Sequence, residues 1–354
     1  MTEHEINDVR KDSEFRKISF SKFQKTKVKK ELLQCLIAGK IEPACYWAAE
    51  LICACHYIDV WEIIITYSSR YIHLGNPLLP TYISLRMNNF KDVMSNGFVG
   101  NEIALRNNQK IREIFGEVIA TLCLSQKKHV YEAVKIKKQE EFNMAHMASK
   151  LKAPNVKYGN KVFLPEDPKE LFIAVNELSY HLSNDSKNAY NACYWVEWII
   201  EFEAICKKKK EEITAERRCW ADVDSKYQKD GIWIVWDLIK KIGSEKKSKV
   251  VIKIIDALLE MFTLKYTEAI KKRRKYLIYF AISLLTENVD LSIKIWSNKK
   301  TVQNVVSKIN LVYKEVKKNE VAPATDYLFA GVERSNLDKT LDRLERMNKL
   351  MGLS

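Results

Sequence analysis

The sequence predicts an all-α fold with two related helical lobes, and three observations support this class. Only 10 Gly and 7 Pro occur among 354 residues, so long stretches lack the residues that make turns. Within these stretches apolar residues recur at steps of three and four, the spacing of one helix face. A short aromatic motif also occurs twice. The length is sufficient for two domains.

The expected helices follow from this periodicity and from a few proline and glycine signals. Pro43 stands in the first turn of a helix, where proline costs no hydrogen bond. The sequence Gly75-Asn76-Pro77 ends the following helix, and Pro80 starts another. Further helices are expected at about 13–38, 80–94, 101–124, 128–149, 168–184, 248–265, 267–286, 300–318 and 335–350.

The repeated motif organises the chain. Residues 44–52 read ACYWAAELI, and residues 192–200 read ACYWVEWII. A tryptophan-containing helix is expected after each copy. Duplicated helical units bury their apolar faces on one another, so the two copies are expected to pack into one larger body. The aromatic residues expected in the core of the repeat are Tyr46, Trp47, Trp61, Tyr194, Trp195 and Trp236.

Prolines and composition divide the chain into four parts. Residues 1–152 form the first expected lobe, and residues 153–169, with three of the seven prolines, form a linker. Residues 170–320 form the second lobe, which carries a basic insertion. Residues 321–354 are expected to form a loop and an amphipathic helix. Its apolar stripe favours docking onto the chain's own core, with a partner as the alternative. The stripe consists of Leu337, Leu341, Leu344 and Leu350.

Part of the first lobe resembles a known family. The carrying segments are the Tyr46-Trp47 helix, the turn in residues 71–80, and residues 122–133. Residues 28–136 thereby resemble the C-terminal helical domain of the RarA/MgsA/WRNIP-type clamp-loader-related AAA+ ATPases. The resemblance implies a collar-like oligomerisation module associated with replication or repair machinery. The chain departs from the family because it has no GxxxxGK[ST] phosphate loop, and the family pattern has no such duplication.

The sequence predicts no catalytic, metal or cofactor site. The six histidines are scattered, and His56 beside Cys55 is the one close Cys–His pair, but adjacent helix residues point in different directions. Cys53 and Cys55 lack two further metal ligands at a suitable spacing. Glu197 and Glu201 share a helix face, which favours a solvated surface or salt bridges to nearby lysines.

The eight cysteines and the N-terminal sequence bear on the compartment. Several cysteines lie in apolar helical runs, as free thiols do in a reducing environment. The polar N-terminal stretch does not resemble a signal peptide, and the longest apolar run, 276–285, is too short to span a bilayer. We therefore expect an intracellular protein that is not secreted and not associated with membranes. It would lie in the cytoplasm or nucleus, or in a viral factory or virion if the protein is viral.

Basic clusters are the candidate binding residues. The formal net charge is +14, which favours polyanionic partners. Clustered cations hold phosphate backbones without reading sequence, and interleaved aromatics can stack on exposed bases. A solvated surface is the alternative. The candidates are Lys207, Lys208, Lys209, Lys210, Arg217, Arg218, Trp220, Lys271, Lys272, Arg273, Arg274 and Lys275.

These observations leave three functional hypotheses. The first is a non-enzymatic helical scaffold that acts with DNA replication or repair machinery and binds DNA through its basic clusters. The second is a structural protein, such as a minor capsid or virion component of a large DNA virus, which the Lys-, Ile- and Asn-rich usage suits. Protein partners or self-association are expected in both cases, with no small-molecule substrate. The third, an enzyme, has no identifiable catalytic constellation.

Overall fold

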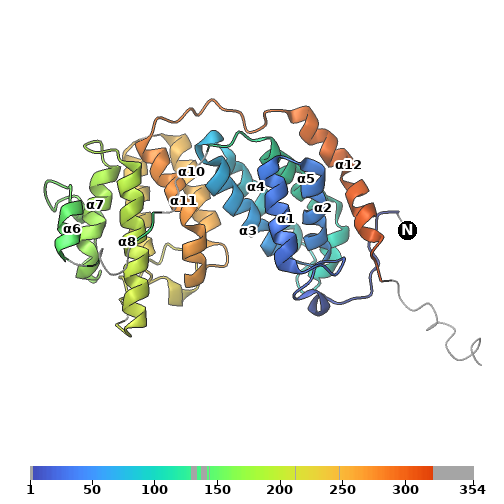
Figure 1. Ribbon diagram of the computed structural model, residues 1–354, viewed down its shortest axis with the longest axis horizontal. Coiled ribbons are helices and arrows are strands. Elements are labelled where there is room, and N and C mark those ends of the chain that lie inside the picture. The colour runs from blue at the N-terminus through green and yellow to red at the C-terminus, as the bar shows by residue number, and fades with distance from the viewer. Residues whose placement is uncertain are drawn as a thin grey trace, which may run out of the picture.

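The computed structural model describes residues 3–128, 134–136, 142, 144–211, 213–246 and 248–321. The chain is 66% helix, which confirms the all-α class. Its helices form an arch with two arms (Figure 1). The terminal helix expected at 335–350 lies outside the described residues, as does most of the helix expected at 128–149. No helix among the described residues is long and apolar enough to cross a membrane.

The first helix set makes up one arm. It consists of α1 (Lys25–Ala38), α2 (Ile41–Cys53), α3 (Tyr57–Tyr67), α4 (Leu79–Ser95) and α5 (Gln109–Leu124). The helix expected to start near residue 13 starts at Lys25 instead, after a single 3-10 turn at Asp12–Phe15. Similarly, α5 begins only after Asn108, whose side chain caps it by accepting a hydrogen bond from the Ile111 N–H.

The second helix set follows after the short helix α6 (Met144–Lys150). It consists of α7 (Phe172–Leu182), α8 (Ala189–Lys208), α9 (Ile232–Glu245), α10 (Lys249–Thr263) and α11 (Glu268–Thr286). Side-chain caps from Asn188 and Ser248 fix the starts of α8 and α10. A last helix, α12 (Lys299–Lys317), ends the described chain.

The two sets share a helix order and part of their packing pattern, but α9 also packs against α10 and α11, whereas α3 makes no comparable contact with α4 or α5 among the described residues. In the first set α1 packs against α2, α3 and α5, α2 packs against α3 and α5, and α4 packs against α5. In the second set α7 packs against α8, α9 and α11, α8 packs against α9 and α11, and α10 packs against α11. Each of these contacts in the first set therefore has a counterpart in the second.

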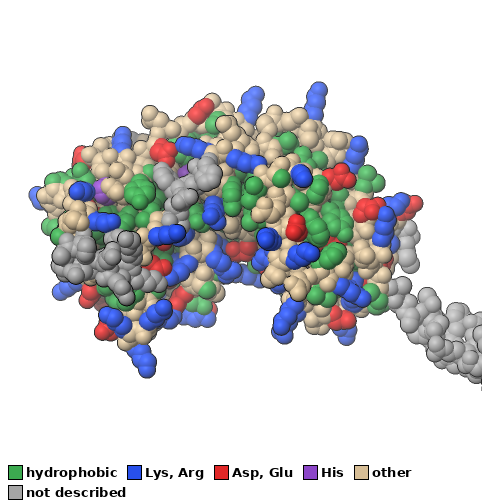
Figure 2. Space-filling view, viewed as in Figure 1, with side chains coloured by type: hydrophobic (Ala, Val, Ile, Leu, Met, Phe, Trp, Pro, Cys, Tyr) green, Lys and Arg blue, Asp and Glu red, His purple; other side chains and the backbone are tan. Residues whose placement is uncertain are grey.

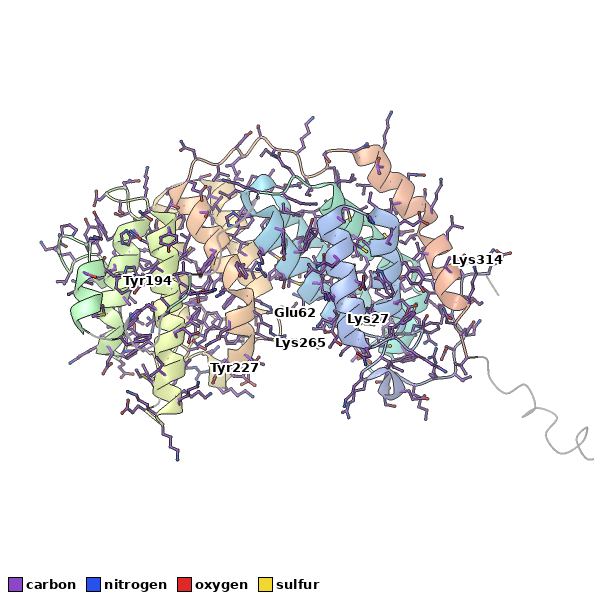
Figure 3. The ribbon with its side chains drawn as sticks, in the orientation of Figure 1. Lys27, Glu62, Tyr194, Tyr227, Lys265 and Lys314 are labelled. Carbon is purple, nitrogen blue, oxygen red and sulfur yellow. The ribbon has the colours of Figure 1, made fainter. Side chains whose placement is uncertain are left out.

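The arms meet through α10 and α11, which pack against α4, α3 and the turn that follows α3. In this turn the ring of His73 lies 4.7 Å from that of Phe280 on α11. The buried guanidinium of Arg274 on α11 donates to Glu62 on α3, which Figure 3 labels between the arms. The apolar core is continuous through both sets.

The connection between α11 and α12 runs back over the arch and places α12 at the outer end of the first arm. This helix falls within residues 170–320, which the sequence analysis assigned to the second lobe, yet it packs against α5 and α2 of the first set (Figure 1). Ile309 lies against Gly116, where a Cβ atom would come within 2.8 Å of the Ile309 Cδ1 atom. The buried ring of Tyr313 lies under the guanidinium of Arg112, 4.1 Å from its centroid. These contacts join a distant segment to the first set.

The repeated aromatic residues differ in burial between the sets. Trp61 and Trp236 are enclosed in the core, as are Tyr194 and Trp195. Tyr46 and Trp47 are only partly buried. Phe23, which is 40% exposed, covers the edge of Trp47 at 5.7 Å between ring centroids. All three of these aromatic residues are thus buried in the second set, whereas only Trp61 is buried in the first.

Candidate anion-binding site

Four of the predicted binding residues form ion pairs within the fold, and three of these, Arg218, Lys271 and Arg274, are buried, whereas Lys275 is partly exposed. Arg218 donates to Asp167 and, at 2.9 Å, to Asp237. Arg274 is 1% exposed and pairs with Glu62. Lys271 and Lys275 also face carboxylates inside the protein. These four cations stabilise the fold and are not free to bind DNA.

Helical geometry explains this correction to the prediction. Residues 271–275 are five consecutive cations on α11, and residues three or four apart on a helix share a face. Lys271, Arg274 and Lys275 consequently face inward, where Lys275 pairs with Glu197 at 2.8 Å. Lys272 and Arg273 face outward. Lys272 forms a surface ion pair with Glu201 at 2.8 Å, so both glutamates singled out in the sequence pair with lysines of α11.

The remaining predicted residues are exposed. Residues 207–210 extend from the C-terminal end of α8, and Figure 2 shows Lys and Arg side chains gathered at this end of the arm. Arg217 is exposed and donates to the side chain of Gln228. Trp220 is 37% exposed, with its ring edge-on to Trp233 and the Lys240 amine 4.2 Å from its centroid. Trp220 is thus partly occupied by neighbours within the fold.

A pocket of about 400 Å³ lies beside the end of α8. Its walls come from α8, from the start of α11 and from the long connection between α8 and α9. Figure 3 labels Tyr227, which stands in its wall at the end of this arm. Its lining residues are Ile200, Glu203, Ala204, Lys207, Lys208, Ile213, Thr214, Lys226, Tyr227, Lys229, Asp230, Glu268, Lys271 and Lys272. We refer to it as the lysine-rimmed pocket.

Buried charges form the floor of the lysine-rimmed pocket. The Lys271 amine lies 2.5 Å from Glu203 and 2.7 Å from Asp230. Tyr266 donates to Asp230 at 2.8 Å, and the Gly231 N–H donates to Glu203 at 2.8 Å. Each carboxylate therefore has partners within the fold, and the floor is a preformed network.

This network shifts the protonation of its members. Burial raises the pKa of Glu203 to about 7, because desolvation disfavours its charged form. The nearby carboxylates Glu203 and Asp230 hold the pKa of Lys271 above its usual value, despite its burial. Burial and the charge of Asp230 outweigh the attraction of Lys271 and raise the pKa of Glu203, whereas both carboxylates favour the charged form of Lys271.

The rim gives the pocket its positive sign. Five lysines stand on the rim, from α8, the α8–α9 connection and α11. Three of them have carboxylate partners, Lys207 with Glu268, Lys226 with Asp224 and Lys272 with Glu201. The lysines are Lys207, Lys208, Lys226, Lys229 and Lys272. Clustered ammonium groups around a concave surface concentrate anions there. The donors on the lining are the Thr214 hydroxyl and the lysine amines, groups that also bind phosphate or carboxylate oxygens.

The pocket holds carboxylates and lysines rather than the residue types of a nucleophilic triad. No His, Cys or Ser stands among its lining residues. The Glu203 carboxylate is already held by Lys271 and by the Gly231 N–H. Among the described residues, no group of three or more His, Cys, Asp or Glu is arranged to hold a metal ion. Binding of an anion is the chemistry that this arrangement supports.

Sequence reasoning found only part of this site. Lys207, Lys208, Lys271 and Lys272 were among the candidates, whereas Lys226 and Lys229 were not. These two lysines flank Tyr227 singly, without forming a run. The sequence indicates them in one way: they lie in the long connection after the second ACYW motif, which has no counterpart after the first.

Comparisons with protein-family models, with curated proteins and with solved structures found no match for this chain.

Proposed function

We propose that this protein is a non-enzymatic helical scaffold that binds the phosphate backbone of nucleic acid at the lysine-rimmed pocket. The observation that carries the proposal is the convergence of five rim lysines from three segments that are far apart in the sequence. Backbone phosphates are bound by such groups through release of counterions, independently of base sequence. Lys209 and Lys210, which are exposed directly beside the rim, extend the same surface.

We also propose that the two helix sets arose by internal duplication. The ACYW motif lies near the start of the corresponding helices α2 and α8, and the helix order and part of the packing pattern of the two sets agree. A duplicated unit that lacks its own closed core is stabilised by stacking on its copy. The contacts of α10 and α11 with α3 and α4 serve that role in this chain.

The proposed setting is replication or repair machinery, with the first set acting as a collar-like module. Its support is the resemblance of residues 28–136 to the clamp-loader-related helical domain, within which residues 129–133 lie outside the described part. The segment 71–80 of that resemblance contains the turn that joins α3 to α4 and contacts α11. In this account the turn holds the arms together rather than binding nucleotide.

The test is fluorescence anisotropy of the purified protein with labelled single-stranded, duplex and forked DNA across a salt series. We expect binding to all three, weakening linearly in the logarithm of salt concentration with a slope of about 0.9 per phosphate contacted on duplex DNA. A lack of binding at about 50 mM salt would overturn the proposal. The structural role in a virion or capsid would then be the leading function.

A further inference from the structure

A second hollow, of about 670 Å³, lies between α2 and α12 at the opposite end of the arch. Its lining is mainly apolar along the middle, with Ile41 and Tyr46 on α2 and Val305, Leu311 and Val312 on α12. Leu311 is 61% exposed, one of the most exposed large apolar side chains among the described residues. We refer to this hollow as the α2/α12 groove.

One wall of the groove is α12, which packs tightly against the first helix set. On the inner side of α12, Val302, Ile309, Tyr313 and Val316 are buried against the first set. Asn310 exchanges hydrogen bonds with Arg112 and Gln109 on α5. The apolar residues at the groove therefore form a second stripe on α12, beyond the stripe that packs on the core. A helix with two apolar stripes has surface to bury against a further element.

The course of the chain after α12 brings a candidate element close. The Val321 N–H donates to Asp8 at 2.8 Å, and its carbonyl accepts from the Val9 N–H. These bonds hold the end of the described chain against the N-terminal segment, six residues beyond Glu315 at the end of the groove. Figure 3 labels Lys314, which also lines this end.

Residues 322–354, outside the described part of the chain, contain an amphipathic pattern. Leu337, Leu341 and Leu344 are spaced four and three apart, so they share one face of a helix. Charges of both signs flank that face, with Asp338 and Glu345 on one side and Arg343 on the other. The groove also carries both signs, with Lys308 on α12 and Glu42 on α2, so the flanks have opposite charges to meet.

The chain between residue 321 and residue 335 is long enough for the following segment to reach any part of the α2/α12 groove. The 13 residues 322–334 can span about 40 Å when extended. Helix α12 has 19 residues and is therefore about 28 Å long. A segment that begins at residue 335 can thus lie along any part of the α2/α12 groove.

We infer that residues 335–350 of this chain form a helix that occupies the α2/α12 groove, with Leu337, Leu341 and Leu344 against Leu311 and Val312. This covers the partly buried Tyr46, as neighbouring segments cover its counterpart Tyr194. The segment is thereby an intramolecular partner of the first set. A displaced segment would leave the groove open to another amphipathic helix.

The first test changes residues of the segment 335–350 and measures amide hydrogen exchange in the groove of the full chain by mass spectrometry. In the double variant Leu341→Asp/Leu344→Asp we expect amides of residues 304–315 to exchange about tenfold faster than in the wild-type protein. The control, Lys339→Ala/Arg346→Ala, changes the net charge by the same amount on the opposite face and should leave exchange unchanged. Equal exchange in all three proteins would overturn the inference.

A second experiment changes a residue of the groove and leaves the sequence of the segment 335–350 unchanged. Leu311→Asp alters an exposed side chain, so the fold is retained, and we expect trypsin to cleave after Arg343 and Arg346 several-fold faster. Ser307→Asp, which adds the same charge to an exposed position outside the lining, is the matched control and should cleave at the wild-type rate. Wild-type cleavage in Leu311→Asp would overturn the inference. Sedimentation of the wild-type protein as a dimer, with groove protection that increases with concentration, would also overturn it by assigning the groove to a second copy.

Discussion

The two helix sets have the same helix order but differ in the connection that follows the ACYW helix. In the first set α2 ends at Cys53 and α3 begins at Tyr57. In the second set α8 continues to Lys208, and α9 begins only at Ile232. The longer α8 and the added connection supply most of the lining of the lysine-rimmed pocket. The comparison indicates that the common helices build the body, whereas the addition to one set builds the candidate site.

The sets also differ in how their ACYW helices are covered. In the second set Lys150 lies over the ring of Tyr194 at 4.4 Å, and Phe142 stacks near Trp198 at 5.2 Å. In the first set Tyr46 borders the α2/α12 groove. The same motif thus lies in the closed core of one set and lines an open groove in the other.

The largest expected effect is on the closed copy of the motif. Trp195→Ala removes a ring that is 1% exposed and should lower the free energy of unfolding by about 3–5 kcal/mol, because it leaves a cavity in the core. Trp47→Ala removes a partly buried ring and should cost about half as much. Urea denaturation followed by circular dichroism measures both. Equal losses would show that the two copies are equally closed.

The charged floor of the pocket, which the first set lacks, should give a pH dependence. The pKa of Glu203 is raised from its ordinary 4.5 to about 7. The folded state therefore holds a proton that the unfolded state releases between these values, and the stability contributed at this site falls as pH rises from about 4.5 to 7. Glu203→Gln cannot release this proton.

We accordingly expect the difference in free energy of unfolding, Glu203→Gln minus wild type, to increase by about 2–3 kcal/mol from pH 5 to pH 8. Urea titrations at these two pH values provide the measurement. A constant difference between the two proteins would contradict the assigned ionisation. Glu201→Gln, on the same helix but paired at the surface with Lys272, is the control and should show little change.

The smallest expected effect on stability concerns the exposed end of α8. Replacing residues 207–210 together with Ala should change the free energy of unfolding by no more than about 0.5–1 kcal/mol, because the side chains are exposed and the ion pair of Lys207 with Glu268 is at the surface. Thermal denaturation measures this. Loss of folding in this variant would refute the assignment of these lysines to a binding surface.

The sequence predicted the class of fold and several helix starts for physical reasons that are local. Few turn residues, helical periodicity, Pro43 and Pro80 all act within a few residues of their position. The place of α12 was not predictable in this way, because its packing on α5 depends on Gly116 and Arg112, almost 200 residues away. The burial of Arg274 and Lys271 was accessible in principle, since five consecutive cations on a helix cannot all face water.

The candidate site was predicted in part. The run of lysines at residues 207–210 correctly indicated the C-terminal end of α8. Such a run does not show which acidic side chains lie opposite it in the fold. Lys226 and Lys229 join the rim through the fold of the α8–α9 connection, where Asp224 caps a short turn and Arg218 is anchored by Asp167. Such long-range ion pairs have no periodic signal in a single sequence.

The most direct test of the central proposal compares two lysine pairs in the salt-series anisotropy experiment. Lys208→Ala/Lys229→Ala removes two rim cations, whereas Lys110→Ala/Lys300→Ala removes two exposed cations outside the pocket. We predict that the rim variant binds duplex DNA about tenfold more weakly at low salt, with a salt slope smaller by about 1.8, and that the control binds like the wild-type protein. Equal affinity of the two variants would contradict binding at the lysine-rimmed pocket.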